Sequence, residues 1–174
     1  IEHMFVANTH HTLLFFTEKG RLYWLKVYEI PEGDKNSKGR AIQNLMQMPG
    51  DDKVRAIIDI ANLDDKEFVQ QHYIVLCTKK GVIKKTSLED FSRPRSTGVN
   101  AITIVEGDQL LEAKLTDGNS EIMMALQSGR AIRFPEEKVR PTGRGAIGVG
   151  GIEVDDANDS VVGMLCVKKE DLEN

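Results

Sequence analysis

Short apolar runs, each followed by a polar pair, a glycine and a second apolar run, recur three times along the chain. The three stretches read LLFFTEKGRLYW from Leu13, YIVLCTKKGVIKK from Tyr73 and EIMMALQSGRAIRF from Glu121. The runs are too short for helices and are rich in residues that strands favour. A glycine after each polar pair adopts positive φ without steric cost, as a tight turn requires. The pattern therefore predicts three β-hairpins.

A second set of glycines, Gly39, Gly98 and Gly148, lies 19, 17 and 19 residues after the hairpin glycines. Each precedes another run that looks like a strand, and these runs are Ala41–Met48, Ala101–Val105 and Gly151–Val154. Further apolar runs follow at Val54–Ile60, Leu110–Leu115 and Val161–Val167. We therefore expect about four strands in each of three repeat units, which cover roughly residues 13–60, 73–115 and 121–167.

The spacing of the repeats favours a radial all-β fold. The hairpin glycines are 61 and 48 residues apart, and propeller blades recur with similar periods of about 40–50 residues. The longer first interval holds the acidic stretch 62–67, which we expect to form a surface loop. Residues 87–91 are expected to form one helical turn at most.

Positive charge follows the repeats, although the whole chain has a net charge of −4. The segments 17–45, 77–98 and 127–148 together hold 17 of the 23 basic residues and 8 of the 27 acidic ones, so they carry a net charge of +9. If the repeats are arranged around an axis, these segments form a basic rim on an acidic body. Such a rim suits duplex DNA, which carries one negative charge per ~1.7 Å. No motif for base readout is present, so we expect contacts to the DNA backbone.

The sequence contains no recognisable catalytic motif. GxSxG, HExxH and phosphate-loop patterns are absent. The acidic pairs Asp51-Asp52 and Asp155-Asp156 are interpreted as solvated turns, and Cys77 and Cys166 as buried thiols in a reducing compartment. No apolar run approaches the roughly 20 residues of a membrane helix. Because the chain starts at Ile1 without a methionine, we interpret it as a segment of a longer protein.

Several of these stretches resemble the C-terminal domain of DNA gyrase A subunits. They are LFFTEKGRLYWLKVYEIP from Leu14, Lys38-Gly39-Arg40, FSRPRSTG from Phe91, and Ala131-Ile132-Arg133-Phe134 with Val139-Arg140-Pro141. The resemblance covers essentially the whole chain, residues 1–174. It implies a partial β-pinwheel, a propeller-like fold with about three to four four-stranded blades here.

The resemblance also implies a function, which is the sequence-nonspecific binding and wrapping of duplex DNA around the basic rim. The rim residues that it implies are Lys38, Arg40, Lys79, Lys80, Lys84, Lys85, Arg93, Arg95, Arg130, Arg133, Arg140 and Arg144. In the holoenzyme, wrapping supports ATP-dependent negative supercoiling, and the implied partners are the gyrase B subunit plus a second A subunit. We expect no catalysis and no cofactor in this segment, although the holoenzyme uses ATP and Mg. The implied location is the bacterial cytoplasm, on the chromosome.

The sequence departs from that family in two ways. The signature basic box QRRGGKG is absent, and the length accommodates three to three and a half blades where the family usually has about six. The cleavage-domain tyrosine is also absent, since Tyr23, Tyr28 and Tyr73 lie in or beside predicted strands. Two alternatives stay open, a propeller-like scaffold for protein interactions and the C-terminal domain of a topoisomerase IV A subunit. The run Tyr23–Val27 favours gyrase over topoisomerase IV, and salt-dependent DNA binding would argue against the scaffold.

Overall fold

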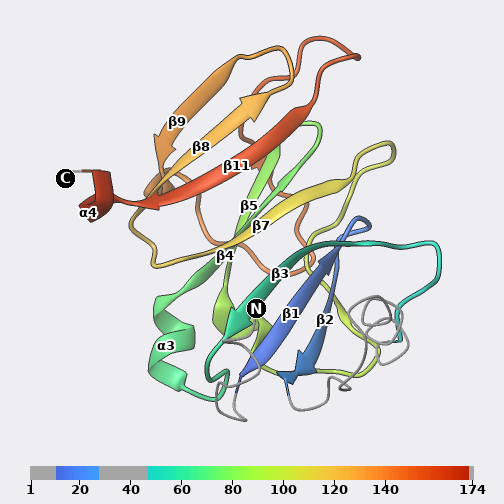
Figure 1. Cartoon of the computed structure of the whole chain (residues 1–174), viewed down its shortest axis with the longest axis vertical. Coiled ribbons are helices and arrows are strands. Elements are labelled where there is room, and N and C mark those ends of the chain that lie inside the picture. Colours follow the sequence, from blue (N-terminus) through green and yellow to red (C-terminus); the bar gives the residue numbers. More distant parts are fainter. Residues whose placement is uncertain (1–10, 28–46, 173–174) are drawn as a thin grey trace, which may run out of the picture.

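Three antiparallel sheets follow one another in the computed structural model, which describes residues 11–27 and 47–172 (Figure 1). The first sheet has the strand order β3-β1-β2-β6, the second β10-β5-β4-β7 and the third β11-β8-β9. The strands are β1 (Thr12–Thr17), β2 (Arg21–Lys26), β3 (Val54–Ile60), β4 (Tyr73–Thr78), β5 (Val82–Ser87), β6 (Val99–Asn100), β7 (Leu110–Thr116), β8 (Ser120–Leu126), β9 (Ala131–Pro135), β10 (Val149–Gly150) and β11 (Val161–Lys168). The helices are α3 (Lys66–Gln71), α4 (Lys169–Leu172) and the 3₁₀ turns η2 (Leu88–Phe91) and η3 (Glu136–Lys138). The predicted all-β, propeller-like fold is confirmed.

The three predicted hairpins are confirmed as β1–β2, β4–β5 and β8–β9. Their turn glycines Gly20, Gly81 and Gly129 have φ values of 85°, 95° and 98°, which residues with a Cβ rarely adopt. The runs predicted from Val54, Leu110 and Val161 form β3, β7 and β11. The single helical turn expected within residues 87–91 forms as η2.

The fourth strand of a sheet comes from the following repeat, which corrects the prediction of four strands within each unit. Strand β6 pairs with β2 in the first sheet, and β10 pairs with β5 in the second. These strands lie immediately after Gly98 and Gly148, so the predicted strands Ala101–Val105 and Gly151–Val154 are wrong. Residues 41–46 of the remaining predicted run lie outside the described residues.

The predicted strands fail because two consecutive N–H groups turn toward one carbonyl. The N–H groups of Ala101 and Ile102 both donate to Gly20 O, at 2.8 and 3.2 Å. Those of Gly151 and Ile152 donate to Gly81 O at the same two distances. Successive N–H groups of a strand point to opposite sides, so the strand ends where this pair of bonds begins.

Side chains alternate between two buried faces along the central strand of the second sheet. On β4, Ile74 and Leu76 face a core shared with the first sheet, whereas Val75 and Cys77 face a core shared with the third. All four are fully buried. Burial on both faces explains why this strand is an unbroken apolar run. The sheets therefore stack through two apolar layers, with the second sheet in the middle (Figure 1).

A short helix replaces part of the loop expected at residues 62–67. Lys66 and Glu67 belong to α3, which begins because the Asp65 carboxylate accepts a hydrogen bond from the Phe68 N–H at 3.2 Å. Val69 on this helix packs into the core between the first and second sheets. The expectation of a loop was therefore wrong for its last two residues.

An aspartate supports each of the first two hairpin turns from the segment that precedes the outer strand of its sheet. Asp108 accepts hydrogen bonds from the backbone N–H groups of Lys80 at 3.0 Å and Gln109 at 2.8 Å. Asp52 does the same in the first turn, with Lys19 and Lys53 as donors. Asp52 is buried, so its interpretation as a solvated residue was wrong.

Two lysines assigned to the basic rim lie in the interior instead. Lys84 is 1% exposed, and its ammonium donates to two backbone carbonyls, Ala101 O at 2.7 Å and Arg144 O at 2.6 Å. Lys85 is 4% exposed and lies 3.5 Å from a carboxylate oxygen of fully buried Glu136. On a strand buried on both faces, neither side chain can reach a phosphate. The assignment of Lys84 and Lys85 to DNA contacts is therefore corrected.

Replacing the second turn glycine by alanine should destabilise the fold far more than the same change in the third turn. A Cβ on Gly81 would lie 2.2 Å from Ile152 O, whereas one on Gly129 would meet nothing within 4 Å. Both glycines have nearly the same positive φ, so their backbone strain cancels in the comparison. Gly81→Ala should cost roughly 1–3 kcal/mol more in the free energy of unfolding. Urea unfolding of both variants tests this, and equal losses would contradict the close packing at Gly81.

The buried Lys84 should make stability depend on pH in a defined window. Burial lowers the pKa of Lys84 from 10.5 to about 8, and the nearby Asp90 only partly opposes this. Between these two values the unfolded chain binds more protons, so the free energy of unfolding rises with pH. The stability of the wild type relative to Lys84→Met should therefore increase from pH 8 to 10, by up to about 1.4 kcal/mol per pH unit. A constant difference across that range would show that the pKa of Lys84 is not lowered in the folded state.

Candidate nucleic-acid interface

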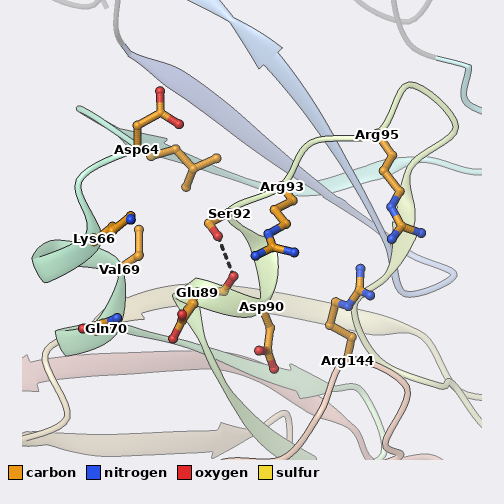
Figure 2. Close-up of a pocket in the computed structure, with 11 residues that line it drawn as sticks. Asp64, Lys66, Val69, Gln70, Glu89, Asp90, Ser92, Arg93, Arg95 and Arg144 are labelled. Carbon is orange, nitrogen blue, oxygen red and sulfur yellow. Dashed lines mark hydrogen bonds between the residues drawn. The ribbon is translucent and has the colours of Figure 1, made fainter.

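Three of the predicted rim arginines line one cleft at the side of the first and second sheets. Arg93 and Arg95 lie on the loop between η2 and β6, and Arg144 lies on the loop between η3 and β10. Figure 2 shows Arg95 and Arg144 extending toward each other, with Arg93 beside them. The cleft has a volume of about 660 Å³, and acidic Glu89 and Asp90 also line it.

An adjoining cleft adds an arginine from the first repeat. Arg21 on β2 lines it together with Arg95 and Arg144, and its volume is about 450 Å³. The Arg21 guanidinium donates a hydrogen bond to Thr97 O at 2.9 Å. Arg21 was not among the predicted rim residues, although it lies in the basic segment 17–45. Arg21, Arg95 and Arg144 define what we call the arginine cleft.

The exchange of strands is what brings residues of three repeats together. Residues 95–98 form a tight turn with a hydrogen bond from the Gly98 N–H to Arg95 O at 3.0 Å, and β6 then pairs with β2. The loop that carries Arg144 is held by Thr103, whose hydroxyl donates to Gly145 O at 2.6 Å. Both loops are therefore anchored beside the arginines that they carry.

The cleft arginines differ from other rim candidates in their electrostatic surroundings. Among the described residues, Arg95 and Arg144 lie in no ion pair within 4 Å. Arg130 lies 3.4 Å from an Asp155 oxygen, and Arg133 lies 3.6 Å from a Glu121 oxygen. The first pair of guanidiniums is thus free to bind an external anion, whereas the charge of the second pair is partly neutralised.

The remaining predicted residues fall outside this arrangement. Lys79 and Lys80 lie at the second hairpin turn, and Arg140 lies on the loop before Arg144. These three line neither cleft, so their role in binding stays a prediction. Lys38 and Arg40 lie outside the described residues.

Groups that could support chemistry are sparse in the described ranges. Burial raises the pKa of the Cys77 and Cys166 thiols to about 12, so both are protonated at neutral pH. No three His, Cys, Asp or Glu side chains within residues 11–27 and 47–172 come together as metal ligands would. No helix in these ranges is long and apolar enough to span a membrane.

Comparison with known proteins agrees with the repeats. The DNA gyrase C-terminal domain family, a beta-propeller, matches residues 11–61, 72–117 and 120–168. The A subunit of DNA gyrase from Salmonella typhimurium is 39% identical over 170 residues, which are 98% of this chain and 19% of that protein. The chain thus spans about a fifth of the length of the curated relatives that it matches.

Solved structures share the fold. A C-terminal domain of DNA topoisomerase IV superposes with a TM-score of 0.80 at 28% identity, over 94% of this chain and 49% of that one. A DNA gyrase A C-terminal domain superposes with a TM-score of 0.73 at 26% identity, over 94% of this chain and 50% of that one. The sequence match distinguishes the two, since the family and the Salmonella relative both carry the gyrase name. The chain belongs to the DNA gyrase A C-terminal domain family.

Proposed function

We propose that this chain binds the backbone of duplex DNA without sequence preference and contributes to DNA wrapping by the A subunit of a gyrase. The arginine cleft carries the proposal. Its Arg95 and Arg144 guanidiniums are unpaired by described carboxylates and stand on anchored loops of two different repeats. Guanidiniums bind phosphate oxygens with two parallel hydrogen bonds, so a fixed pair of them suits successive phosphates on one strand.

The position of the cleft favours contact with DNA that runs across the repeats. Arg21, Arg95 and Arg144 come from the first, second and third repeat, so a strand lying over them crosses the boundary between neighbouring sheets. DNA that follows such boundaries from blade to blade curves with the array. We infer that the parent protein uses this curvature in ATP-dependent negative supercoiling, with a B subunit plus a second A subunit, on the chromosome in the bacterial cytoplasm.

Removing the two free arginines should weaken binding to every duplex alike. For Arg95→Gln with Arg144→Gln, log affinity should fall less steeply with log salt, by about 0.9 for each lost phosphate contact. Fluorescence anisotropy with two duplexes of unrelated sequence measures both quantities. Lys168→Gln, which removes an exposed charge outside both clefts, is the matched control and should leave the salt slope unchanged. A loss limited to one duplex would argue against backbone recognition, and a wild type with no salt-dependent binding would favour a scaffold for protein interactions.

The chain should bend DNA but should not support supercoiling on its own. Bending a 20–30 bp site by 40–90° costs on the order of 1–6 kcal/mol, so a tight wrap needs contacts spread over a long arc. The sequence offers three basic segments and lacks QRRGGKG. Added to a gyrase without its C-terminal domain, the chain should leave relaxed plasmid without negative supercoils. The test is plasmid topology on gels after the chain and a nicking-closing enzyme are added, where a large uniform shift in linking number would show that three segments suffice.

A further inference from the structure

The ammonium of Lys84 occupies an unusual place, in the interior directly beneath the arginine cleft. It donates to Ala101 O at 2.7 Å and to Arg144 O at 2.6 Å, and the side chain is 1% exposed. The two carbonyls belong to different repeats, which are otherwise distant in sequence. One buried cation therefore joins both segments that carry the cleft arginines.

Each of the two carbonyls is close to a cleft arginine along the chain. Ala101 follows β6, which begins directly after the turn that Arg95 opens. The other carbonyl is that of Arg144 itself, so the same residue has its carbonyl inside and its guanidinium in the cleft. A shift of the ammonium would move the Arg144 backbone directly.

A neutral side chain at this position could not replace the ammonium. Two buried carbonyls would lose a charged donor, and the loop would then relax toward water and carry Arg144 with it. The hydrogen bond from Thr103 to Gly145 O holds the next residue, but it does not supply a donor to the Arg144 carbonyl.

We propose that Lys84 is a positioning residue of the arginine cleft, which touches no DNA and holds Arg144 at the separation from Arg95 that lets both contact one DNA strand. The inference rests on the proposed DNA binding. It predicts that the effect of Arg144 on binding depends on Lys84. A lysine that served stability alone would leave that effect unchanged.

A double-mutant cycle tests the dependence. Arg144→Gln should lower the salt slope of binding to a duplex of random sequence by about 0.9. Lys84→Met should lower it by a similar amount, although the buried ammonium itself contacts no phosphate. Arg144→Gln added to Lys84→Met should change the slope no further. A full Arg144 effect in the Lys84→Met background would overturn the proposal.

The matched control is Leu76→Ala. Leu76 lies opposite Lys84 on β4, is fully buried and lines neither cleft. This change weakens the same sheet, so Arg144→Gln should retain its full effect in that background. All variants are compared at a temperature where circular dichroism shows them folded. A lost Arg144 effect in the control would mean that general loosening explains the result and would overturn the specific role.

Titration of the wild type gives a second test that does not need Lys84→Met to fold. Because the pKa of Lys84 is about 8, its charge is lost between pH 7 and 9.5. Asp90 is the charged neighbour that opposes this shift, while the thiols of Cys77 and Cys166, with pKa values of about 12, do not titrate in the window. The affinity lost on Arg144→Gln should therefore be smaller at pH 9.5 than at pH 7. An equal loss at both pH values overturns the proposal, whereas a wild type that binds no DNA at low salt contradicts the proposed function instead.

Discussion

The fold depends on one carbonyl in each of two hairpin turns that accepts two N–H groups from the next repeat. Gly20 O and Gly81 O each receive a consecutive pair of donors. The approach is so close that a Cβ on either glycine would overlap an incoming carbonyl, at 2.3 Å from Ile102 O and 2.2 Å from Ile152 O. Glycine at these positions therefore serves both the turn and the contact between repeats. Neighbouring sheets are joined by this contact before any side chain is considered.

Side chains reinforce the contact at matching places in two sheets. Trp24 on β2 donates its indole N–H to Phe91 O at 2.8 Å, and Lys85 on β5 donates to Glu136 O at 3.3 Å. Both acceptors lie in the 3₁₀ turn that follows the next hairpin. An aromatic donor and a buried cation thus make equivalent connections. Glu136 gains further donors, the Thr116 hydroxyl and the Ser120 N–H, so both oxygens of the buried carboxylate are hydrogen-bonded, as burial demands.

The sequence predicted what depends on local chemistry and missed what depends on neighbours. The hairpins and the strands β3, β7 and β11 follow from apolar runs and turn glycines, which are local signals. The exchange of β6 and β10 leaves no such signal, because two-residue strands have no periodicity and their partners lie in another repeat. Lys84 and Lys85 were misplaced for the same reason, since charge on a strand normally indicates solvent and only the covering repeat makes them interior. Arg21 was missed although it lies in a basic segment, because only the incoming β6 turns the edge of β2 into the wall of a cleft.

The shared strand also has a consequence for synthesis on the ribosome. The first sheet has three of its strands once Ile60 has emerged, but its fourth strand begins only at Val99. At about 5–20 residues per second, the edge of β2 stays unpaired for about 2–8 seconds. During that interval the edge is a template for other chains, and its terminal residues Arg21 and Lys26 place positive charge where an intruding strand would have to pair. The arginine that later lines the cleft thus has an earlier task, which is to keep nascent chains apart.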